Sequence, residues 1–116
     1  MKKQKFLLAI LLVLPGMILL AGNGKKETFK VYGNCGLCEN RIETAAKSVE
    51  GVTMAHWDQN SKMMEVNYDA SKTNVKDVQQ AIANVGHDTE LIKATDEAYN
   101  NLPACCQYER KDDTSK

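Results

Sequence analysis

Four cysteines, arranged as two close pairs, are the residues of this 116-residue chain best suited to chemistry. Cys35 and Cys38 form a Cys-x-x-Cys pair, and Cys105 and Cys106 are adjacent. A Cys-x-x-Cys pair can hold one soft metal ion between two thiolates, or it can close into a redox disulfide. Two such pairs are poorly placed to stabilise the fold as disulfides and are well placed to form a cluster of thiolates.

The first pair lies where a predicted strand meets a predicted helix. Residues 28–32 alternate apolar and polar side chains, which is typical of a strand, and residues 38–49 place apolar residues at helical spacing. Cys38 would then begin the helix, where unpaired amide groups and the helix dipole favour a thiolate. Two thiolates on an exposed loop suit Cu(I) or Hg(II), whereas Zn(II) is disfavoured because it prefers four closed ligands.

The rest of the chain predicts one small α+β domain. Its order is βαββαβ, an antiparallel sheet with two helices on one face. A C-terminal extension with one or two helical turns before Pro103 would follow, and then a disordered tail. The predicted boundaries are a linker at 23–27, strands at 52–58, 63–68 and 89–93, a helix at 75–85, the extension at 94–110 and the tail at 111–116.

Residues 1–22 have the pattern of a cleaved signal peptide. A basic start is followed by an apolar run, which Pro15-Gly16 interrupts, and by the small residues Ala21-Gly22. The apolar stretch is shorter than the roughly 20 residues of a membrane-spanning helix. Export to the periplasm is therefore expected, with an uncleaved anchor as the alternative. No cysteine stands near the cleavage region, so a lipid anchor is not indicated.

Charge and motif content exclude several classes of function. Three of the 15 basic residues fall within residues 1–22, which hold no acid, so the remainder carries 12 basic and 15 acidic residues. Nucleic acids require concentrated positive charge, so this balance argues against them, and nothing suggests membrane insertion of the mature chain. The sequence shows no set of nucleophile, base and orienting group and no glycine-rich phosphate loop, so an enzyme is not expected.

Three short motifs resemble the heavy-metal-associated domain family, which includes small copper chaperones, the periplasmic mercury-binding protein and N-terminal modules of metal-pumping P-type ATPases. The motifs are Gly33-Asn34-Cys35-Gly36-Leu37-Cys38 at the loop, Val49-Glu50-Gly51-Val52 at the first helix exit and Ala83-Asn84-Val85-Gly86 at the second. The resemblance covers residues 28–93. It implies a ferredoxin-like fold, a metal ion held by Cys35 and Cys38, and an activity of binding and hand-over.

Two positions near the loop need interpretation. The family usually has methionine two residues before the first cysteine, packed beneath the loop, and this chain has Gly33. The absence of this methionine puts the rigidity of the loop and its metal preference in doubt. His87 follows the second helix exit and should lie beside the loop. It is interpreted either as a third ligand or tuning group, or as a solvated histidine whose ring packs near the site.

Cys105 and Cys106 lie outside the resemblance. Adjacent cysteines rarely pair with each other, because a disulfide prefers Cα atoms about 5.5 Å apart. They can form a second thiolate pair that folds back on the loop or passes the ion on. Alternatively, they are apolar packing residues or form a disulfide with the first pair.

The leading hypothesis is an exported, non-enzymatic protein that captures Cu(I) or Hg(II) and passes it to a membrane transporter or another metal-accepting protein. We expect a monomer, with a metal-bridged dimer as the alternative. A thiol-disulfide oxidoreductase using the same Cys pair is the competing class. A structural adaptor with an inert disulfide is the third.

Overall fold

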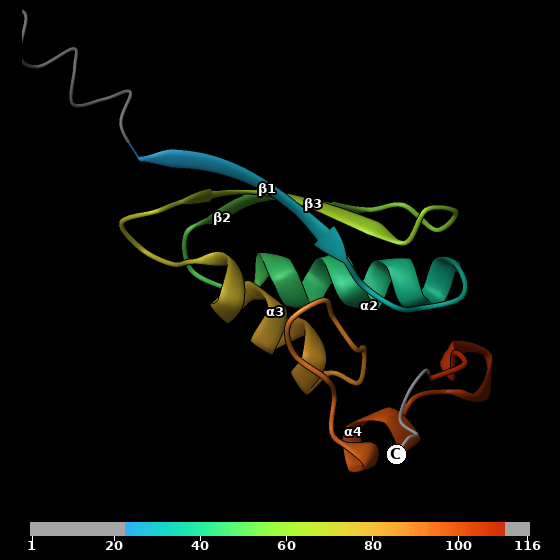
Figure 1. Ribbon diagram of the computed structural model, residues 1–116. Helices are drawn as coiled ribbons and strands as arrows, with labels where there is room; N and C mark the ends of the chain where they lie inside the picture. Colours follow the sequence, from blue (N-terminus) through green and yellow to red (C-terminus); the bar gives the residue numbers. More distant parts are fainter. Residues whose placement is uncertain (1–22, 111–116) are drawn as a thin grey trace, which may run out of the picture.

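The computed structural model describes residues 23–110, so the predicted signal peptide and the predicted disordered tail lie outside the described residues. A small sheet carries two helices on one side, and a C-terminal segment lies below them in the view of Figure 1. The elements are β1 (Gly24–Lys30), α2 (Gly36–Lys47), β2 (Val52–Trp57), β3 (Met63–Asp69), α3 (Val75–Asn84), α4 (Asp96–Asn100) and the 3-10 turn η1 (Ala104–Cys106).

The sheet is antiparallel with the order β1-β3-β2. Alternation of side chains along each strand directs one set towards the helices and the other towards the open face. The inward set is buried, as the alternation predicted: Phe29, Ala55, Trp57, Met64, Val66 and Tyr68. Together with the apolar faces of α2 and α3, these residues form the core. The predicted α+β fold with two helices on one sheet face is confirmed.

Local interactions set the ends of the helices. Cys35 is the N-cap of α2, which therefore begins two residues before the predicted start at Cys38. The cap of α3 is Asn74, whose side chain accepts a hydrogen bond from the backbone N–H of Asp77. The hydroxyl of Ser71, which precedes the helix, donates to the Asp69 carboxylate at 2.7 Å.

Two predicted strands differ from the structure. The first begins at Gly24, within the predicted linker, because the polar residues Lys25 to Glu27 pair with β3 through their backbone groups, and the Lys26 ammonium lies 2.9 Å from the Glu65 carboxylate. The predicted strand at 89–93 is wrong. Thr89 makes a single bridge with Val31, and its hydroxyl and backbone N–H both donate to Ile92 O at 2.8 Å, which closes a turn instead.

The extension at 94–110 folds back onto the domain. Residues 96–100 form the predicted helical turn, α4, and Pro103 is the N-cap of η1. The η1 turn of this segment lies beside the start of α2, where the cysteine loop is placed (Figure 1). Within residues 23–110, none of the helices has the length and apolar character needed to cross a membrane.

Candidate metal centre

The Cys-x-x-Cys pair presents one accessible and one buried thiol. Cys35 caps α2 and is partly exposed, whereas Cys38 lies in the first turn of that helix and is fully buried. The backbone N–H of Asn34 donates to the Cys38 sulfur at 3.3 Å. The loop therefore leaves the Cys35 thiol accessible and holds Cys38 within the core.

The two thiols differ in acidity. The backbone N–H groups of Cys38 and Leu37 lower the pKa of Cys35, because they stabilise its thiolate at the helix start. Burial raises the pKa of Cys38 to about 11, and hydrogen bonding with the Cys106 thiol adds to this increase. The prediction that the helix start favours the Cys38 thiolate is therefore wrong, since the benefit goes to Cys35.

This difference predicts a clear order of reactivity in the metal-free, reduced chain. At pH 7 the thiolate fraction of Cys35 therefore exceeds that of Cys38, and the weaker nucleophilicity of an acidic thiolate offsets part of this difference. We expect iodoacetamide to modify Cys35 at least about tenfold faster than Cys38, as measured by peptide mass spectrometry. The unfolded chain should modify both equally, and equal rates in the folded chain would contradict the assignment.

Close packing beneath the loop explains why position 33 is a glycine. A Cβ atom at this position would lie 3.1 Å from Cη2 of Trp57, 3.2 Å from Cβ of Cys38 and 3.3 Å from Cδ1 of Ile42. The Trp57 indole N–H donates to Val31 O at 3.0 Å, which fixes the ring in this place. Trp57 thus fills the space beneath the loop, where the family pattern has a methionine.

The extension brings the second cysteine pair to the first. The sulfur atoms of Cys35, Cys105 and Cys106 lie within 4.8 Å of one another. The Asn34 side chain donates to the carbonyl of Cys105 at 3.3 Å, and the thiol of Cys35 points to the same oxygen at 3.8 Å. All four cysteines of residues 23–110 are free thiols.

Arg41 also lies at this site, and the sequence motifs did not predict its role. It lies one turn after Cys38 on α2, and its Nη1 donates to the sulfur of Cys106 at 3.2 Å. The spacing of three residues from Cys38 was the available signal, because such residues share one helix face.

His87 is buried and packs beside the site, but it is not part of the cluster formed by Cys35, Cys105 and Cys106. Its Nδ1 lies 2.8 Å from Tyr32 O, its ring stacks on Tyr108 at 5.5 Å, and its Nε2 has no hydrogen-bond partner. Burial lowers the pKa of His87, so the ring is neutral at pH 7. The interpretation as a packing ring is supported, whereas its predicted solvent exposure is wrong because Tyr108 covers it.

A second group of metal-ligating atoms lies elsewhere. Glu39, Glu43 and His56 bring their ligand atoms within 4.8 Å of one another. One Glu43 oxygen accepts a hydrogen bond from the backbone N–H of Trp57 at 2.9 Å and lies 3.4 Å from Nδ1 of His56. These contacts tie α2 to the end of β2, so Glu43 has a structural role.

Residues 28–88 match the heavy-metal-associated domain, and the match covers more than half of the chain. The protein therefore belongs to the heavy-metal-associated domain family, as the three motifs implied. The match ends before Cys105, so the extension is additional to the shared domain.

Individual relatives agree with this assignment. The copper chaperone CopZ of Bacillus subtilis (strain 168) is 32% identical over 65 residues, which are 55% of this chain and 94% of CopZ. The crystal structure of oxidized MerP from Ralstonia metallidurans CH34 superimposes with a TM-score of 0.55 at 26% identity, over 58% of this chain and 94% of MerP.

A further structural relative is the Cu(I)-loaded N-terminal domain of a potential copper-translocating P-type ATPase from Bacillus subtilis. Its TM-score is 0.54 at 28% identity, over 57% of this chain and 84% of that one. The ferredoxin-like fold expected from the sequence is thus shared with solved members of the family.

Proposed function

We propose that this protein captures a soft heavy-metal ion, Cu(I) or Hg(II), through the Cys35–Cys38 loop and passes it to an acceptor protein. The observation that carries the proposal is the pairing of an accessible, acidified thiol at Cys35 with a buried thiol at Cys38 on a heavy-metal-associated fold. Thiolates are the ligands that soft ions prefer. Copper-chaperone relatives favour Cu(I). The resemblance to the family that includes the periplasmic mercury-binding protein is the reason to propose Hg(II) as well.

Capture would begin at Cys35. This thiol meets an incoming ion as the more readily ionised sulfur, and Cys38 then loses its proton as the ion binds, because metal ligation requires the thiolate. Hand-over would proceed by ligand exchange, in which thiolates of the acceptor replace Cys35 first and Cys38 second. The oxidation state of the ion does not change, so the protein would act as a carrier and not as an enzyme.

The acceptor we propose is a membrane metal transporter. The structural similarity to the N-terminal domain of a copper-translocating P-type ATPase supports this choice, because two domains of one fold can present matching thiol loops to each other. Export to the periplasm, proposed from the pattern of residues 1–22, would place capture outside the cytoplasm.

Anaerobic titration of the reduced full chain with Cu(I), Hg(II) and Zn(II) tests this function. We expect one tightly bound Cu(I) or Hg(II) per chain, and loss of tight binding in the double variant Cys35→Ser, Cys38→Ser. Identical binding by the wild type and this variant would refute the proposal. Reduction of insulin without any metal affinity would instead favour the thiol-disulfide oxidoreductase.

A further inference from the structure

The second cysteine pair is placed as a set of ligands would be. Around a single ion with metal–sulfur distances of about 2.3 Å, neighbouring sulfur atoms lie about 4 Å apart. The sulfurs of Cys35, Cys105 and Cys106 already lie within 4.8 Å of one another. Side-chain rotations alone can therefore bring the three sulfurs to a common ion.

A positive charge faces this group. Three thiolates around a monovalent ion carry a net charge of −2, which is costly to hold at a half-buried site. The guanidinium of Arg41 donates to the Cys106 sulfur at 3.2 Å, and hydrogen bonds to a charged acceptor are stronger than neutral ones. Arg41 thus compensates part of the charge that a third thiolate adds, whereas a two-thiolate site has less need of it.

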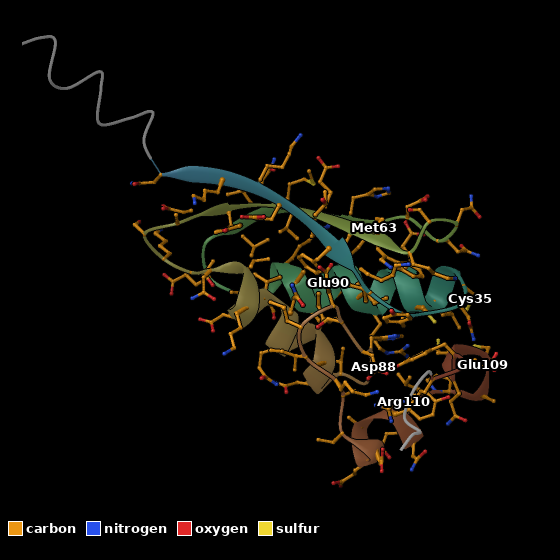
Figure 2. The ribbon with its side chains drawn as sticks, in the orientation of Figure 1. Cys35, Met63, Asp88, Glu90, Glu109 and Arg110 are labelled. Carbon is orange, nitrogen blue, oxygen red and sulfur yellow. The ribbon has the colours of Figure 1, made fainter. Side chains whose placement is uncertain are left out.

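The segment that carries the second pair is held in place by Tyr108 and Arg110, which bind residues 86–88. Tyr108 is buried; its hydroxyl donates to Gly86 O at 2.9 Å and accepts from the backbone N–H of Asp88 at 2.8 Å. Arg110 makes a two-point contact with the Asp88 carboxylate, at 3.0 and 2.8 Å. Figure 2 shows Asp88 and Arg110 side by side, and Cys35 near the η1 end of the same segment.

We infer that the captured ion passes from the Cys35–Cys38 pair to a three-thiolate site formed by Cys35, Cys105 and Cys106, in which the C-terminal extension retains the ion. This inference rests on the proposed function and adds ligands from outside the matched domain. Each thiol that ligates the ion releases its proton to solvent. An acceptor must then displace the sulfurs of the extension before it takes the ion from the loop, so release is slower than from a two-thiolate site.

The single variant Cys105→Ser tests the inference, because Cys105 is exposed and its replacement leaves the core intact. X-ray absorption of the Cu(I)-loaded, reduced full chain should show three sulfurs around the ion in the wild type and two in the variant. Competition with a chromophoric Cu(I) chelator should show at least a tenfold loss of affinity. Transfer of Cu(I) to that chelator should become at least tenfold faster.

Matched controls separate this inference from the proposed function. Glu109→Ser changes an exposed residue of the same segment without removing a sulfur, and it should behave as the wild type. Two sulfurs, unchanged affinity and unchanged release in both wild type and Cys105→Ser would overturn the three-thiolate site while leaving the Cys35–Cys38 carrier intact. Failure of the carrier itself would appear as wild-type binding in the Cys35→Ser, Cys38→Ser variant.

Discussion

Replacement of Asp88 by alanine is expected to lower the free energy of unfolding by about 3–5 kcal/mol, because it removes one partner of a buried ion pair. Asp88 and Arg110 are both largely buried, with 8% and 15% of their side chains exposed. The carboxylate also accepts from the backbone N–H of Ala94 at 2.8 Å. In Asp88→Ala the guanidinium loses its two contacts to this carboxylate, the N–H of Ala94 loses its acceptor, and the extension loses an anchor.

The second carboxylate that Arg110 contacts, that of Asp96, offers a control for this prediction. Asp96 lies 3.0 Å from Nη1 of Arg110, but 94% of its side chain is exposed. Exposed pairs contribute about 0–1 kcal/mol, so Asp96→Ala should unfold at nearly the wild-type denaturant concentration. Urea denaturation of both variants checks the prediction, and equal midpoints for Asp88→Ala and Asp96→Ala would contradict it.

The same pair predicts a pH dependence. Burial alone would raise the pKa of Asp88, but hydrogen bonds from Arg110 and Ala94 outweigh it, so the pKa lies below its usual value. A lowered carboxyl pKa adds stability that is complete above the unfolded pKa and disappears as the pH falls through the folded one. The difference between wild type and Asp88→Ala should therefore persist at pH 7 and shrink below about pH 4.

Replacement of Gly86 by alanine should also be severe, at about 2–5 kcal/mol. Gly86 has φ +110°, a conformation that side chains rarely adopt. A Cβ atom would also lie 2.8 Å from the carbonyl oxygen of Ala98 and 2.9 Å from Cγ of Leu102. Because Ala98 and Leu102 belong to the extension, the variant should lose its docking as well as stability.

Gly36 is the matched control. A Cβ atom there would meet nothing within 4 Å, and the residue begins α2, where alanine is the better helix former. Gly36→Ala should therefore be neutral or slightly stabilising in the same denaturation experiment. Hydrogen exchange of residues 96–108 should accelerate in Gly86→Ala and stay unchanged in Gly36→Ala. A Gly86→Ala variant as stable as Gly36→Ala would show that the extension does not dock as described.

The order of the core elements followed from periodicity alone. Alternation of side chains placed Trp57 and Met64 on the buried face, and helical spacing placed Ile42 and Ile82 in the core, because burial of apolar surface acts on each element separately. The cysteine loop could also be predicted from the sequence, because two cysteines three residues apart at a strand–helix junction restrict the chemistry to that of thiolates. Membership of the heavy-metal-associated family followed from this loop together with the motifs at the two helix exits.

Long-range contacts decided what local patterns missed. The strand predicted at 89–93 contains residues that favour strands, but hydrogen bonds between Thr89 and Ile92 close a turn there. The backbone N–H of Glu90 still donates to Lys30 O, so this segment keeps only a single bridge to the first strand. The acidity of the two loop thiols was likewise assigned to the wrong cysteine. The helix begins at Gly36, so its first amides serve Cys35, and Cys38 is desolvated by the packed core.

The two cysteine pairs show most clearly which features followed from the sequence and which depended on the tertiary structure. The sequence alone determined that four thiols were available and that Cys35 and Cys38 formed a Cys-x-x-Cys pair at a strand–helix junction. It could not place Cys105 and Cys106, because they are about 70 residues from the loop and their position depends on where the extension packs. Tertiary contacts of Tyr108 and Arg110 with the loop at 86–88 decide that position, and with it the number of sulfurs at the site.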